Sequence, residues 1–118
     1  MKAETILLLN VMQLTPTKYR QSIKIIQEIL EIIIRAEQDE DNKLKGILKS
    51  NIIRLCALKT TTAEKYLQML EKAEYIYTEE VNWGERKLIV YRSTNLGKER
   101  YKWFLKINVE LEGEKNEK

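Results

Sequence analysis

The stretch Ser50–Ile76 reads SNIIRLCALKTTTAEKYLQMLEKAEYI and holds two helical patterns of apolar residues, separated by the short joint Ala57–Lys59. We expect the first helix within residues 43–58, either over this whole range or only from near Ser50. The second helix starts at three consecutive threonines, Thr60–Thr62, although their branched side chains are mediocre helix formers. Two helices joined by so short a turn predict a helix-turn-helix.

A β-hairpin is predicted directly after the second helix. The segments YIYTEE (75–80) and RKLIVYR (86–92) are rich in β-branched and aromatic residues, and VNWGE (81–85) between them contains the turn-forming Asn82 and Gly84. A helix-turn-helix followed by a hairpin is a winged helix-turn-helix. The predicted fold class is therefore mainly α with a small β-hairpin (α+β), with an added N-terminal segment and a long C-terminal helix.

Helices are also predicted on both sides of this unit. Upstream, Thr15 as a cap and Pro16 as the first helical residue start a long helix that is apolar on more than one side, and the acidic loop EQDEDN (37–42) follows it. Downstream of the hairpin the pattern becomes helical again. The expected organisation is an N-terminal extension at 1–15 that forms a helix or a strand, the winged helix-turn-helix at 16–94, a C-terminal dimerisation helix at 95–112 and a charged tail at 113–118.

The composition argues against an enzyme or a metal protein. The chain has no histidine and a single cysteine, Cys56, which removes disulfides, zinc clusters and histidine bases. Its four glycines lie far apart, so they form no phosphate-binding loop, and EQDEDN lacks the ligand spacing of a calcium loop. We expect no catalytic residue, no metal and no cofactor. Cys56 is interpreted as a small buried hydrophobic residue, with a redox sensor as the alternative.

Composition also bears on location and source. The apolar run ILLLNVM (6–12) is far shorter than the about 20 residues that a membrane span needs, and no signal-peptide cleavage site follows it. We therefore expect a cytoplasmic protein with no membrane partner. Abundant isoleucine, lysine and glutamate with little glycine or proline is typical of thermophilic proteins.

The positive charge is concentrated in the middle of the chain. Residues 43–106 contain fourteen basic and seven acidic side chains, a net charge of +7, whereas the whole chain has a net charge of +3. Both ends are therefore acidic. A basic centre predicts a polyanionic partner for that part of the molecule. The alternative is a solvated, lysine-rich surface without a partner.

Within this fold the threonines have a functional interpretation. The N-terminal residues of the second helix meet base edges in the DNA major groove, and small hydroxyl side chains allow close approach. Alternatively, one threonine caps the helix and the others are incidental. We expect Trp83 to pack on the body of the domain, with DNA contact as the alternative. The predicted DNA-binding residues are Lys59, Thr60, Thr61, Thr62, Lys65, Gln68, Arg86, Lys87 and Arg92.

The order of elements resembles archaeal winged-helix DNA-binding proteins that dimerise through a C-terminal helix. The resemblance rests on YRQSIKIIQEIL (19–30), on residues 50–76 and on STNLGKERY (93–101), which is similar to the family's threonine-x-x-glycine start of the last helix. It implies a homodimer that binds double-stranded DNA, as a sequence-specific transcription regulator or as a non-specific chromatin-associated protein. No small-molecule effector is evident. The alternative is a winged helix used only for protein–protein contact, because Glu64 and Glu71 dilute the positive charge of the second helix.

The final helix carries apolar residues on two sides. Tyr101, Phe104 and Leu105 lie along one side, and Trp103, Ile107 and Leu111 lie along a second. A domain of this size can cover one of them, so the other predicts a homodimer interface. The alternative is a monomer in which the N-terminal segment ILLLNVM (6–12) covers this second side within the same chain. The predicted interface residues are Tyr101, Trp103, Phe104, Ile107 and Leu111.

Overall fold

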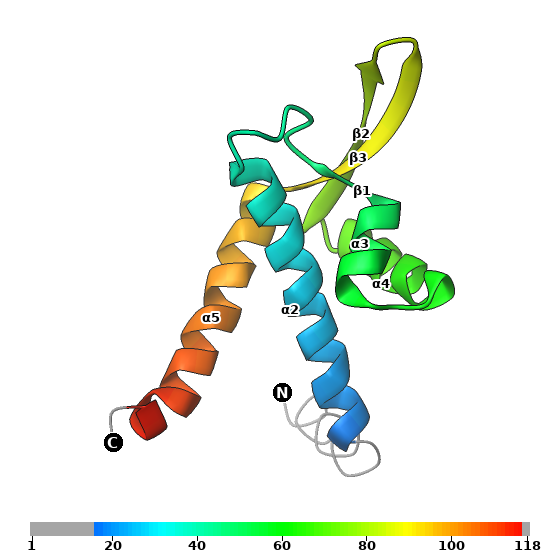
Figure 1. Ribbon diagram of the computed structural model, residues 1–118. Coiled ribbons are helices and arrows are strands. Elements are labelled where there is room, and N and C mark those ends of the chain that lie inside the picture. Colours follow the sequence, from blue (N-terminus) through cyan, green and yellow to red (C-terminus); the bar gives the residue numbers. More distant parts are fainter. Residues whose placement is uncertain (1–15, 117–118) are drawn as a thin grey trace.

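A computed structural model describes residues 16–116, and within this range the chain forms four helices and a three-stranded antiparallel sheet of order β1-β3-β2 (Figure 1). The predicted mainly α, α+β winged helix-turn-helix is confirmed. The N-terminal extension at 1–15 lies outside the described residues. The elements are α2 (Pro16–Gln38), β1 (Ile47–Leu48), α3 (Lys49–Cys56), α4 (Thr60–Lys72), β2 (Ile76–Trp83), β3 (Arg86–Ser93) and α5 (Asn95–Asn116).

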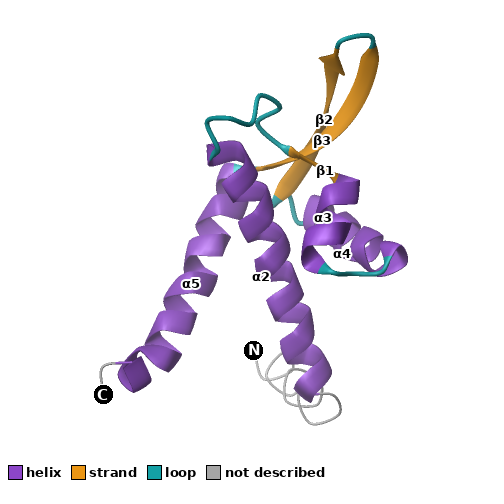
Figure 2. Ribbon diagram, in the orientation of Figure 1, coloured by secondary structure: helices purple, strands orange, loops and turns teal. Residues whose placement is uncertain are grey.

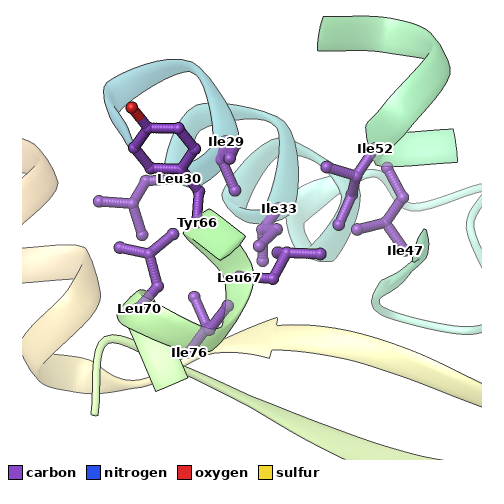
Figure 3. Close-up of a cluster of buried hydrophobic side chains, with 9 residues drawn as sticks. All are labelled: Ile29, Leu30, Ile33, Ile47, Ile52, Tyr66, Leu67, Leu70 and Ile76. Carbon is purple, nitrogen blue, oxygen red and sulfur yellow. The ribbon is translucent and has the colours of Figure 1, made fainter. Parts of the chain in front are cut away.

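The core lies where α2 meets the helix-turn-helix and the base of the sheet (Figure 3). The helix α2 contributes three fully buried residues, Ile29, Leu30 and Ile33, which explains why its apolar residues cover more than one side. The other residues of this cluster come from β1, α3, α4 and β2. They are Ile47, Ile52, Tyr66, Leu67, Leu70 and Ile76.

The joint between α3 and α4 is the three-residue turn that the sequence predicts. Ala57 has a left-handed backbone, with φ of 54°. Its N–H donates to the Arg54 carbonyl oxygen at 3.2 Å, and the Leu58 N–H donates to the Ile53 carbonyl oxygen at 3.1 Å. These two bonds form a Schellman motif, which ends α3 and turns the chain sharply towards α4.

An alanine in a left-handed conformation carries a steric cost that glycine avoids. We expect Ala57→Gly to stabilise the fold by about 0.5–1 kcal/mol, because relief of the Cβ clash exceeds the entropy cost of glycine. The measurement is the urea unfolding midpoint at constant slope. Ala73→Gly is the matched control, since Ala73 has a φ of −77° and the same substitution there should destabilise. Equal destabilisation by both variants would contradict this prediction.

The segment before α3 differs from the expected helix over 43–58. The helix begins only at Lys49, close to the alternative start near Ser50, and Ile47–Leu48 form a short strand that pairs with Tyr91 and Val90. The preceding loop is closed by Asn42, whose side-chain amide donates to the Ala36 and Gly46 carbonyl oxygens at 2.7 and 2.9 Å. Two residues are too few to show strand alternation, so this strand has no sequence signature.

The wing is a regular hairpin that projects away from the helices (Figure 2). Its strands pair from Ile76 with Ser93 to Trp83 with Arg86. They are joined by a two-residue turn whose Gly84 has a φ of 66°. The hairpin is confirmed, and β2 extends three residues further than the predicted segment 75–80.

The start of α5 is fixed by a cluster around Thr94. Its hydroxyl donates to the Glu74 carbonyl oxygen at 2.6 Å and accepts from the Gly97 N–H at 2.9 Å, while its own N–H donates to the Tyr75 carbonyl oxygen at 2.9 Å. The threonine-x-x-glycine sequence thus forms an N-cap that is also bonded to the segment between α4 and β2. From there α5 runs to Asn116, so residues 113–116 of the predicted tail are helical.

Candidate nucleic-acid interface

The two sides of α4 have opposite character. Ala63, Tyr66, Leu67 and Leu70 are buried against the core. The opposite side presents Thr61, Lys65, Gln68 and Lys72, all exposed and separated by four, three and four residues. This spacing places them in one stripe along the helix, here called the α4 stripe. Lys72 is absent from the predicted DNA-binding residues, although it lies seven residues after Lys65 and the same periodicity identifies it.

The N-terminus of α4 has no side-chain cap. Lys59 occupies the N-cap position without a capping hydrogen bond, and its carbonyl oxygen accepts from the Ala63 N–H at 2.9 Å. The alternative in which one threonine caps the helix is therefore wrong. Thr60 and Thr61 are exposed and Thr62 is half-buried. Three small hydroxyl side chains thus surround the positive end of the helix dipole, an arrangement that suits a phosphate.

An ion pair lies beside the α4 stripe. Lys49, the first residue of α3, places its ammonium nitrogen 2.9 Å from Glu64 Oε2 on α4. The hydrogen bond and the charge of Glu64 raise the pKa of Lys49 above its ordinary value. The negative charge of Glu64 is therefore locally balanced.

The Arg92 guanidinium is bonded to three groups of its own chain. Its Nε donates to the Lys45 carbonyl oxygen at 2.9 Å, Nη2 donates to the Leu44 carbonyl oxygen at 2.7 Å, and Nη1 forms an ion pair with Glu79. Three of the five N–H donors of Arg92 are therefore bonded within its own chain. Its guanidinium fastens the loop before β1 to the wing.

The other wing residues are accessible. Arg86 and Lys87 are exposed at the start of β3, directly after the turn. Trp83 lies opposite Arg86 at the far end of the hairpin and is 48% exposed. The expectation that Trp83 packs on the body of the domain is wrong, because the hairpin carries its tip away from the helices (Figure 1).

The predicted interface residues of α5 divide into two groups. Tyr101 and Phe104 are partly buried and pack against the core of their own chain, so the structure does not place them on an outer face. Trp103, Ile107 and Leu111 are 53%, 50% and 72% exposed. The Arg100 guanidinium lies 4.1 Å from the centroid of the Trp103 ring. We call Trp103, Ile107 and Leu111 the α5 outer row.

Cys56 behaves as a structural residue. It is half-buried at the end of α3, and burial raises the pKa of its thiol to about 11. The thiol is therefore protonated at neutral pH, and the reactive thiolate of a redox sensor is disfavoured. Within residues 16–116 no cluster of histidine, cysteine and acidic residues could hold a metal ion, and no helix there is long and apolar enough to cross a membrane.

Several solved structures share this fold. The chain is similar to MepR, a transcription regulator of the Staphylococcus aureus multidrug efflux pump MepA, with a TM-score of 0.62 and 21% identity over 92% of this chain and 78% of MepR. A MepR mutant bound to an oligodeoxyribonucleotide has a TM-score of 0.63 and 17% identity over 98% of this chain and 83% of the mutant chain. MepR bound to ethidium bromide has a TM-score of 0.56 and 20% identity over 92% of this chain and 77% of the MepR chain. No protein-family model and no curated protein matches the sequence.

Proposed function

We propose that this protein is a sequence-specific double-stranded DNA-binding protein, and that it regulates transcription in the cytoplasm as a homodimer. The observation that carries the proposal is the α4 stripe, a polar and basic row on the open side of the second helix of a helix-turn-helix. That helix is the one that enters the major groove in this motif. The similarity in fold to a MepR structure bound to an oligodeoxyribonucleotide supports it.

Each part of the surface has a role in the proposal. Gln68 can pair with adenine through two hydrogen bonds, and Lys65 can reach guanine or a phosphate. Lys59 and the three threonines suit the phosphate backbone at the helix N-terminus. Arg86 and Lys87 in the wing suit phosphates or the minor groove. Arg92 is reassigned to positioning the loop before β1, because three of its five N–H donors are bonded to Lys45, Leu44 and Glu79 of its own chain.

The proposed homodimer is supported by the exposed α5 outer row. Pairing with the same row of a second copy would remove Trp103, Ile107 and Leu111 from water, and a two-fold axis would present two α4 helices to one duplex. Residues 16–94 would then form the DNA-binding domain, and α5 would form the dimerisation helix. The expectation of no effector is not carried forward, because a MepR structure of this fold contains ethidium bromide.

A gel-retardation assay across a salt series tests the function directly. Retention of duplex DNA that weakens steeply with salt, together with preferred sequences in a selection experiment, is the expected result. No retention at low salt would instead favour a winged helix used for protein–protein contact. Equal retention of all sequences would favour a non-specific, chromatin-associated protein.

The wing makes a quantitative prediction. Changing both Arg86 and Lys87 to glutamine should lower the magnitude of the salt slope by roughly 0.9 for each phosphate that these side chains neutralise in the wild-type complex. Arg92→Gln is the matched control, because it removes a cation from the same strand that is already paired within the protein. The prediction fails if the double variant keeps the wild-type slope, or if Arg92→Gln lowers the slope as much.

A further inference from the structure

The ion pair between Lys49 and Glu64 is formed by two different helices at the edge of the proposed DNA surface. Lys49 begins α3, and Glu64 is the fifth residue of α4. The side chains are 45% and 43% exposed, so the pair lies at the surface and remains open to a ligand. Lys49 bonds only one carboxylate oxygen, Oε2, at 2.9 Å. Among the residues that the structure describes, Oε1 of Glu64 has no hydrogen-bond partner.

Glu64 is a neighbour of the α4 stripe. It stands three residues after Thr61 and four residues before Gln68, and residues at these spacings are neighbours on a helix surface. A carboxylate here would normally oppose DNA binding, because it faces a polyanion. Pairing with an ammonium group at 2.9 Å changes this, since a neutral pair has a weak field at the distance of the nearest phosphates. The paired carboxylate therefore repels the phosphates of a nearby duplex only weakly.

When a base edge comes within hydrogen-bonding distance of Glu64, the unbonded Oε1 can accept only from a donor on that base. In the major groove the donors are the cytosine N4 and adenine N6 amino groups, whereas guanine and thymine present acceptors. Adenine also presents the N7 acceptor beside its amino group, which would repel the second lone pairs of a carboxylate. Cytosine offers its amino group without an adjacent acceptor on the same base. A carboxylate in this position therefore selects cytosine.

We propose that Glu64 reads a cytosine amino group in the major groove, and that Lys49 is a positioning residue that orients and neutralises this carboxylate. The inference rests on the proposed function, which supplies the DNA, and it adds a base preference that the α4 stripe alone does not provide. Lys49 lies on α3 and contacts Glu64 from outside its own helix, so it orients the carboxylate in the unbound protein.

Selection of binding sites from a randomised duplex tests the assignment. Wild-type protein should enrich cytosine at one position of each half-site, and Glu64→Gln should lose this preference while keeping preferences elsewhere. The discrimination against other bases at that position should fall by roughly 10- to 150-fold, the effect of losing one hydrogen bond to a charged group. Glu71→Gln is the matched control, because it removes the same charge from α4 seven residues further on.

The outcomes separate the inference from the function. If Glu64→Gln binds duplex DNA with an unchanged cytosine preference, the assignment of Glu64 is overturned and the proposed function stands. If the wild-type protein retains no duplex, the function fails and the inference fails with it. A general gain in affinity that Glu71→Gln reproduces would also overturn the assignment, because it would reflect charge alone.

A double-mutant cycle tests the role of Lys49. We expect Lys49→Gln to weaken DNA binding more in the wild-type background than in the Glu64→Gln background, because only the former leaves an unpaired carboxylate beside the phosphates. The selected base at the Glu64 position should also become less sharply defined in Lys49→Gln. Additive effects with an unchanged base preference would show that Lys49 binds a phosphate independently and would overturn its positioning role.

Discussion

Replacing both Trp103 and Ile107 with glutamine is expected to give a folded monomer of 14.0 kDa that binds a two-half-site duplex at least about 100-fold more weakly than wild type. The weakening follows from the loss of linkage between two DNA-binding units. In a dimer the second α4 helix binds at the high effective concentration set by the first. A monomer has only one such helix per duplex, so this advantage disappears although its own DNA surface is unchanged.

The fold itself should tolerate this double change. Both side chains are about half exposed, and neither belongs to the core cluster of buried residues. Their exposure in a single chain leaves a tryptophan and an isoleucine in one row with Leu111, which is the pattern of a protein interface. The inward side of α5, with Tyr101 and Phe104, remains untouched and continues to pack against α2.

Sedimentation equilibrium and gel retardation measure the two parts of this prediction. Leu55→Gln is the matched control, because Leu55 is an equally exposed apolar residue on α3 rather than on α5. The control should sediment at twice 14.0 kDa, as wild type should. Wild-type protein that sediments as a 14.0 kDa monomer at micromolar concentration would refute the dimer through the α5 outer row.

Gly97→Ala is expected to destabilise the fold by about 3 kcal/mol or more. A Cβ atom at this position would lie 2.0 Å from the Tyr75 carbonyl oxygen and 2.9 Å from its carbonyl carbon. Both are backbone atoms, so no side chain can swing aside to relieve the clash. The first turn of α5 would have to move, and the hydrogen bonds of Thr94 to Glu74 and Tyr75 would break with it.

Urea unfolding measures this destabilisation, and Asn95→Ala provides the control. Asn95 lies in the same helical turn but is exposed, so alanine there should change stability by less than about 0.5 kcal/mol. A decrease of about 3 kcal/mol would remove a large share of the total stability of a domain this size. If Gly97→Ala unfolds at the wild-type midpoint, the close packing of α5 on Tyr75 is wrong.

Local sequence patterns were sufficient for the elements whose signals are short in range. The spacing of apolar residues determined α2 and α4, the three-residue joint determined the turn between α3 and α4, and turn residues between two β-rich segments determined the wing. The α4 stripe also follows from helical periodicity, since its members repeat every three or four residues. In each case the residues that decide the structure are neighbours along the chain.

Tertiary structure alone decided the features that depend on residues far apart in the sequence. β1 forms only because β3 is beside it, and the Arg92 guanidinium is bonded to the loop carbonyls of Leu44 and Lys45, which lie more than forty positions earlier in the chain. Lys49 meets Glu64 across fifteen positions. The inward packing of Tyr101 and Phe104 and the exposure of Trp83 likewise depend on where α2 and the hairpin lie. Periodicity identifies the apolar sides of a helix, but only the packing of its neighbours determines which side remains exposed to solvent.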